Sequence, residues 1–164
     1  MKIVISESQY QRLIEAEEEQ KVLNIPSLKF FNNNWFLLQE FLERKGNPPY
    51  SFGENLALTG TPIKSLGNLQ SVVGFLDLRG TSIESLGNLQ SVGGYLDLTG
   101  TQIKSLGNLR SVGGELDLRN TPIESLGNLQ FVCGNLLLTK TPLYKMYSEK
   151  QIRKMVNVEG NILI

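Results

Sequence analysis

The sequence predicts an α/β solenoid in which short parallel strands stack with one strand per 20-residue repeat and helical caps cover both ends. Three observations predict it. Four blocks of 20 residues follow one another without a gap over 56–135, and a partial fifth block fills 136–143. Each block opens with Leu-x-Leu, the alternation of a strand with one inward face. Helix-like segments flank the array on both sides, one with an apolar stripe at 34–45 and one with a capping-box pattern that begins at Ser148.

The four blocks differ at few positions, and their apolar residues recur in place. Leu stands at block positions 1, 3, 11 and 14, Ile at 8 and Val at 17, and a glycine in the SLGN segment interrupts any helix. Each block is therefore predicted to be one strand followed by a turn-rich return. One block cannot bury six apolar residues alone, so neighbouring blocks must stack into a continuous core. The blocks read LALTGTPIKSLGNLQSVVGF, LDLRGTSIESLGNLQSVGGY, LDLTGTQIKSLGNLRSVGGE and LDLRNTPIESLGNLQFVCGN.

The array divides the chain into three parts: an N-terminal strand and helix cap region (1–52), the repeats (53–143) and a C-terminal helix–strand cap (144–164). Residues 34–45 are predicted to form the N-terminal cap helix, which Asn33 or Asn34 can cap and Gly46 ends. At the other end, Ser148 and Gln151 form a capping-box pattern that opens a helix to about Val156. A turn and a short strand are predicted after it.

The first 25 residues leave two interpretations open. MKIVIS resembles a strand, and Ser6 with Gln9 is a second capping-box pattern that opens a helix. The segment either extends the N-terminal cap or acts as a separate docking element or dimer strand.

The repeat resembles the leucine-rich-repeat family. The family pattern L-x-x-L-x-L-x-x-N-x-L maps, in one block, onto Gly93, Leu96, Leu98, Thr101 and Ile103. Two departures occur. The leading Leu is replaced by Val73, Gly93, Gly113 or Cys133, of which Cys133 is expected to be a small buried residue. The ladder Asn is replaced by Thr, whose hydroxyl can satisfy a neighbouring carbonyl.

The resemblance implies a leucine-rich-repeat solenoid that presents a strand-lined concave face, a fold that hosts many binding roles. The opening, the 20-residue repeat style and the IRKMVNVEGNILI ending together resemble small repeat proteins of bacteria and their phages.

Composition argues against catalysis. The chain has no histidine and one cysteine, and it contains no GxxxxGK[ST], GxGxxG or GxSxG motif. The usual general base, zinc-type metal sites and phosphate loops are therefore missing. We expect no catalytic residue, no bound cofactor and no metal, and hence no enzyme.

Charge and hydropathy limit the classes of partner and the location that we expect for this chain. Sixteen basic residues balance sixteen acidic ones, so nucleic acid and membranes are not expected as partners. The chain lacks an apolar run long enough for a membrane span and lacks a signal-peptide pattern at its start. A cytoplasmic location is expected, in the host cytoplasm if the chain is of phage origin.

The residues that alternate with the inward leucines are expected to point outward and to form columns across the stack. One column holds Asp77, Asp97 and Asp117, whose like charges repel at strand spacing. Either flanking arginines neutralise this column and nothing binds there, or the column and its aromatics recognise a partner. The candidate partner-binding residues are Phe75, Asp77, Arg79, Tyr95, Asp97, Glu115, Asp117 and Arg119.

The sequence thus favours a protein–protein interaction module, a monomer or weak homo-oligomer, whose partner is another protein. The alternative is a structural protein that self-assembles through its N-terminal segment or caps. A second ladder, in which Lys64, Glu84, Lys104 and Glu124 alternate in charge, is expected to support stacking weakly.

Overall fold

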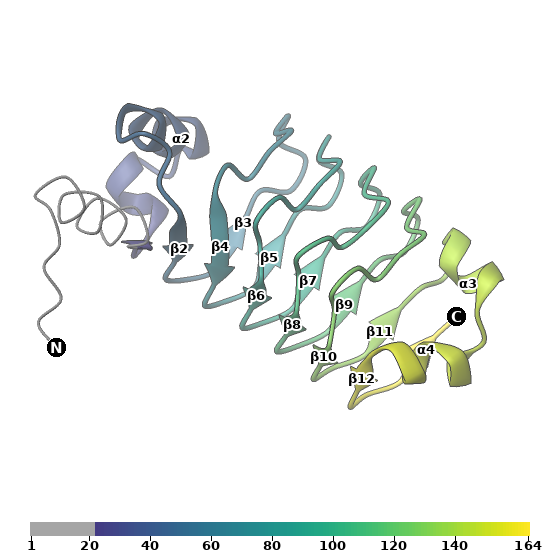
Figure 1. Ribbon diagram of the computed structural model, residues 1–164. Coiled ribbons are helices and arrows are strands. Elements are labelled where there is room, and N and C mark those ends of the chain that lie inside the picture. The colour runs from purple at the N-terminus through teal and green to yellow at the C-terminus, as the bar shows by residue number, and fades with distance from the viewer. Residues whose placement is uncertain (1–21) are drawn as a thin grey trace, which may run out of the picture.

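The computed structural model describes residues 22–164, which form a solenoid of two parallel sheets (Figure 1). We call the seven-stranded sheet sheet A and the six-stranded sheet sheet B. Sheet A contains, in spatial order, β1 (Leu23–Ile25), β2 (Tyr50–Phe52), β4 (Leu69–Val72), β6 (Ser91–Val92), β8 (Ser111–Val112), β10 (Phe131–Val132) and β12 (Asn157–Val158). Sheet B contains β3 (Leu56–Ala57), β5 (Leu76–Asp77), β7 (Leu96–Asp97), β9 (Leu116–Asp117), β11 (Leu136–Leu137) and β13 (Ile162–Leu163).

The predicted solenoid is confirmed, and each repeat contributes a second strand that the sequence did not predict. The Leu-x-Leu segments form sheet B with a constant offset of one repeat, so that Leu76 pairs with Leu96 and Leu96 with Leu116. The segment around Val72 or Val92 forms sheet A with the same offset. The second strand of each repeat has a single inward valine. One residue gives no apolar–polar alternation from which a strand could be predicted. We call each pair of strands and its connecting loops a rung.

The core consists of the six repeated apolar residues, stacked rung on rung. In the third repeat all six have no exposed surface: Leu96, Leu98, Ile103, Leu106, Leu109 and Val112. The turn after each sheet B strand from β3 to β11 is closed by the threonine of the repeat. Thr101 is fully buried, and its hydroxyl donates to the Leu98 carbonyl at 2.8 Å, as predicted.

The N-terminal cap is the helix α2 (Trp35–Arg44), preceded by the short 3₁₀ helix η1 (Leu28–Phe31). Asn34 caps α2, since its side-chain oxygen accepts from the Phe36 and Leu37 amides. The predicted helix over 34–45 is thus confirmed, and Trp35, Leu38 and Leu42 are buried against the first rungs. The cap covers one end of the stack (Figure 1).

A buried tyrosine ties this cap to the first repeat. The Tyr50 hydroxyl donates to the Leu66 carbonyl at 2.7 Å and accepts from the Gln39 side chain of α2 at 3.2 Å. Burial raises the pKa of this hydroxyl further above neutral pH.

The C-terminal cap contains α3 (Pro142–Met146), α4 (Glu149–Met155) and the last strand pair, β12 and β13. The predicted capping box is present: the Ser148 amide donates to the Gln151 side chain at 2.9 Å. Ile152 of α4 is fully buried. Because β12 pairs with β10 and β13 with β11, the chain's last segment forms one more rung.

Within residues 22–164, no helix combines the length and apolar character needed to span a bilayer. The strand and helix predicted near the start of the chain fall on 1–21, outside the described residues.

Candidate partner-binding face

The outward side of sheet B carries all eight residues that the sequence singled out, in three parallel columns. The register that pairs Leu76, Leu96 and Leu116 also aligns the residues before and after them. The columns, from β3 to β11, hold Asn55, Phe75, Tyr95, Glu115 and Asn135; Ala57, Asp77, Asp97, Asp117 and Leu137; and Thr59, Arg79, Thr99, Arg119 and Thr139. We call this surface the sheet B face.

Two aromatic rings stack on this face. The ring centroids of Phe75 and Tyr95 lie 4.6 Å apart and their planes differ by 7°. This separation matches the spacing of adjacent strands, so the backbone register alone brings the rings into contact. Tyr95 is 39% exposed. The stack therefore presents apolar surface to solvent together with the tyrosine hydroxyl.

Asp77 and Asp117 are not the exposed acidic column that the alternation predicted. Both are buried, because the arginine two residues further on folds back over each of them. Arg79 Nη2 lies 2.5 Å from Asp77 Oδ2, and Arg119 Nη2 lies 2.6 Å from Asp117 Oδ2. We call these two pairs the Asp–Arg clamps.

Each clamp also fixes the backbone. The Arg79 amide donates to Asp77 Oδ1 at 3.1 Å, and the Arg119 amide donates to Asp117 Oδ1 at 3.0 Å. Burial by itself would raise the pKa of Asp77, but the hydrogen bonds from Arg79 outweigh it and hold this pKa below its usual range. The same pairing raises the pKa of Arg79, and Asp117 raises that of Arg119.

The β7 rung between the clamps has no arginine in this column. Thr99 stands in that column, and its amide donates to Asp97 Oδ1 at 2.9 Å. The other oxygen of Asp97 lies 3.4 Å from Arg79 Nε, a longer contact than in either clamp. Within the part of the chain that the structure describes, the buried Thr99 hydroxyl oxygen has no hydrogen-bond partner.

Glu115 follows Tyr95 in the first column, on the next rung. It is exposed, and its Oε2 accepts from the Asn135 side chain at 3.1 Å. Among the described residues it has no arginine or lysine within ion-pair distance. The structure thus brings the eight predicted residues together, and a partner could reach Tyr95, Glu115, part of Asp97 and the half-exposed side chains of Arg79 and Arg119.

The side chains of the predicted charge ladder form no ion pairs among the described residues. Lys64, Glu84, Lys104 and Glu124 are all exposed, and no ion pair within 4.0 Å joins them over residues 22–164. Their contribution to stacking is limited to screened attraction at longer range.

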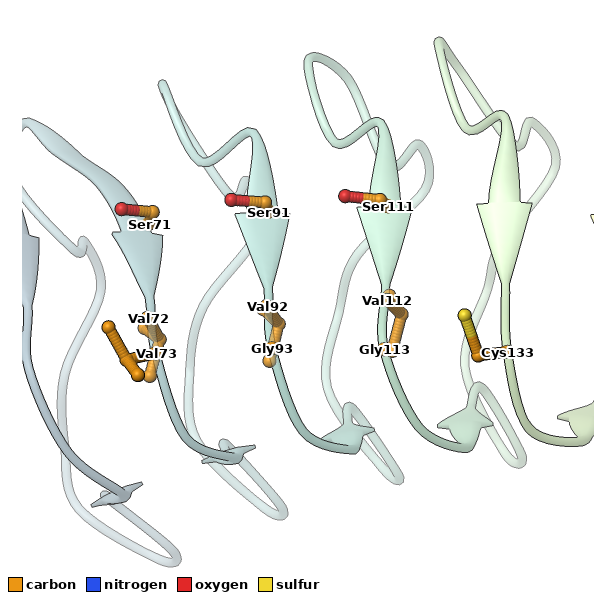
Figure 2. A pocket seen from close by; sticks show the side chains of 10 residues that line it. All are labelled: Ser71, Val72, Val73, Ser91, Val92, Gly93, Ser111, Val112, Gly113 and Cys133. Carbon is orange, nitrogen blue, oxygen red and sulfur yellow. The ribbon is translucent and has the colours of Figure 1, made fainter.

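A groove on sheet A was not predicted from the sequence. It has a volume of about 490 Å³. The serines of three neighbouring strands line it, with Val73 at one end and Cys133 at the other (Figure 2). We call it the sheet A groove. The signal for it was the column of Val73, Gly93, Gly113 and Cys133, which varies while the preceding valine does not.

The prediction that Cys133 is buried is wrong, because Cys133 is exposed in the sheet A groove. Val132 is the inward residue of β10, and its immediate neighbour must point to the opposite side of the strand. The glycines of this column permit close approach between rungs: a Cβ built on Gly93 would lie 2.1 Å from the Val73 carbonyl oxygen, and one on Gly113 would lie 2.1 Å from that of Gly93.

Among residues 22–164, no three Cys, Asp or Glu side chains gather closely enough to hold a metal ion. Comparisons with protein-family models, with curated proteins and with solved structures gave no match.

Proposed function

We propose that this chain is a non-enzymatic binding module that recognises another protein through the sheet B face. The observation that carries the proposal is the Phe75–Tyr95 stack, whose tyrosine is exposed and which lies on the same face as the two Asp–Arg clamps. Aromatic side chains supply much of the energy of protein interfaces when a partner covers them. In this proposal the repeats are leucine-rich repeats of the short bacterial or phage type, acting in the cytoplasm.

Rigidity of the face supports this role. The clamps fix two arginine side chains and two strand ends by hydrogen bonds to both side chain and backbone. A partner that binds a fixed surface loses less conformational freedom than one that must order flexible side chains. The clamps therefore act as a preorganised frame, and the aromatic stack beside them acts as the contact.

A site-specific cross-link tests the proposal. A photoreactive phenylalanine analogue placed at Tyr95 should cross-link one protein in extracts of the native cell. The same analogue at Glu84, exposed at another position of the repeat, is the matched control and should not capture that protein. Equal capture from both positions, or capture from Glu84 alone, would mean that the sheet B face is not the site.

Self-assembly is a second candidate, favoured by the C-terminal end of the stack. Leu163 is 50% exposed, and Met155 and Ile164 of the same cap are also exposed. Among the described residues, β13 pairs with β11 alone, so its other edge is free to pair with a further strand. If this end mediates assembly, Leu163→Lys should reduce the molar mass measured by light scattering at high protein concentration.

A further inference from the structure

The sheet B face has an excess of negative charge. Its three columns contain four carboxylates, Asp77, Asp97, Glu115 and Asp117, and two guanidinium groups, Arg79 and Arg119, so −4 and +2 leave −2. The whole chain is neutral, with 16 basic and 16 acidic residues. The excess is therefore a local property of this face.

The excess is concentrated around Tyr95. The Asp77 and Asp117 carboxylates each have their own arginine, which leaves Asp97 and Glu115 as the groups with the least compensation. Asp97 lies two residues beyond Tyr95 along the same strand, and Glu115 is the neighbour of Tyr95 in the next rung. Burial and the nearby carboxylates of Asp77 and Asp97 raise the pKa of Tyr95, in agreement with a negative environment.

The tyrosine ring has Phe75 on one side and Glu115 as its neighbour on the other. Phe75 stacks on the face toward β5. On the β9 side, the Glu115 carboxylate hydrogen-bonds to Asn135, one rung further from Tyr95. A flat cation placed between Tyr95 and Glu115 would stack on the ring and meet the carboxylate edge-on.

We propose that Tyr95, Asp97 and Glu115 bind an arginine side chain on a short, extended basic segment of the partner protein. This inference rests on the proposed function. A guanidinium group is planar, so it can continue the Phe75–Tyr95 stack and donate two hydrogen bonds to one carboxylate, as a lysine ammonium cannot. The partner's positive charge also complements the net charge of −2 on the sheet B face.

The size of the face fits a segment better than a folded domain. Four steps of ~4.8 Å between β3 and β11 span ~19 Å, and four residues along a strand span ~13 Å. This area of ~250 Å² is well below the ~800 Å² that each partner buries in a standard interface between folded proteins.

Titration with capped peptides tests the proposal on the intact protein. The probe is a glycine–serine peptide with one central arginine, and the matched peptides contain lysine or uncharged citrulline instead. Backbone amide shifts measured by NMR at low ionic strength should change saturably around Tyr95, Asp97 and Glu115 with the arginine peptide. Affinity should fall about tenfold with citrulline, as expected for the loss of a charged hydrogen bond.

Two protein variants complete the test. Glu115→Gln should weaken the arginine peptide about tenfold, for the same reason. Glu124→Gln makes the same charge change at an exposed position and should leave binding unchanged. Thermal unfolding of both variants checks that the fold is intact.

Absence of saturable shifts, equal binding of the lysine peptide, or equal weakening by the two variants would each overturn the proposal. If the arginine peptide does not bind but the cross-link from Tyr95 still captures a protein, the sheet B face stands as the site and the arginine chemistry is wrong.

Discussion

A threonine hydroxyl closes the turn after each described sheet B strand from β3 to β11. Thr101 shows the arrangement with no exposed surface, donating to the Leu98 carbonyl at 2.8 Å. The Thr101 backbone amide also donates to this carbonyl, at 3.1 Å. Valine has nearly the same shape but no hydroxyl, so Thr101→Val should remove one of the carbonyl's two donors and lower the free energy of unfolding by about 0.5–1.5 kcal/mol. Urea unfolding measures the change. Thr101→Ser keeps the hydroxyl donor and should lower the free energy of unfolding by less. A larger decrease with serine than with valine would contradict the role of the hydroxyl.

The glycines of the sheet A groove are fixed by the approach of neighbouring backbones. A Cβ at Gly113 would lie 2.1 Å from the Gly93 carbonyl oxygen, a distance that requires the rungs to separate. Gly113→Ala should therefore destabilise the protein by roughly 1–3 kcal/mol. Val73→Ala is the control in the same column, since it shortens a side chain that is 66% exposed and should change the urea midpoint little. A Gly113→Ala protein as stable as the parent would show that the rungs can shift at no cost.

At the scale of single residues, the inward positions could be predicted from the sequence and the outward ones only in part. Leucines and valines that recur every 20 residues must stack, whatever the details of the loops. Burial of Asp77 depends on Arg79 folding back over it, and alternation along a strand says nothing of that contact. The exposure of Cys133 depended on which of two adjacent residues, Val132 or Cys133, faces the core.

At the scale of elements, each Asp–Arg clamp is an ion pair between two residues of one chain segment, at the end of a sheet B strand. The pKa of Asp77 is lower in the folded protein than its usual value of about 3.9, so the ionised form stabilises the fold. This contribution is complete above about pH 4 and is lost as the pH falls through the lowered pKa. Asp77→Asn should therefore destabilise the protein more near pH 7 than near pH 3, measured by urea unfolding.

The control for this prediction is Glu84→Gln, which removes an exposed carboxylate outside the clamps. Its effect should be small at both pH values. If Asp77→Asn costs as much in acid as at neutral pH, the clamp does not contribute through its charge.

Some elements could be predicted from the sequence and others could not. The cap helix over 34–45 and the capping box at Ser148 are local signals, and both appear where the sequence places them. Sheet A is not a local signal, because strands such as Ser91–Val92 are two residues long and exist only by pairing with neighbouring rungs. The eight residues of the sheet B face could be grouped from the repeat period alone, whereas their pairing depended on side-chain geometry.

At the scale of the whole molecule, the solenoid is held together by contacts between neighbouring rungs, so each end needs a cover. Figure 1 shows α3 and α4 at the C-terminal end of the stack. Leu136, Leu138 and Leu143 of the last repeat are almost fully buried, and Ile152, Val156, Val158 and Ile162 of the cap are buried with them in one core. The cap also continues both sheets, through β12 on β10 and β13 on β11.

Removal of residues 144–164 should therefore unfold or aggregate the protein. Each large apolar side chain that becomes exposed costs ~1.5–3 kcal/mol. Three or four of them in the last repeat would cost about as much as the ~5–15 kcal/mol by which a typical domain is stable. The unpaired edges of β10 and β11 would in addition be free to join other chains. Light scattering and thermal unfolding of the shortened chain measure both effects.

Two variants distinguish the loss of the cap that covers the core from the shortening of the chain. Deletion of Ile164 alone removes a half-exposed terminal residue and should leave the melting temperature nearly unchanged. Ile152→Asp keeps the full length but places a charge where α4 is fully buried, and it should reproduce most of the destabilisation. A shortened chain that remains monomeric and melts at the parent temperature would mean that the last repeat is stable without a cap, and that the C-terminal segment serves another purpose, such as the assembly considered for Leu163.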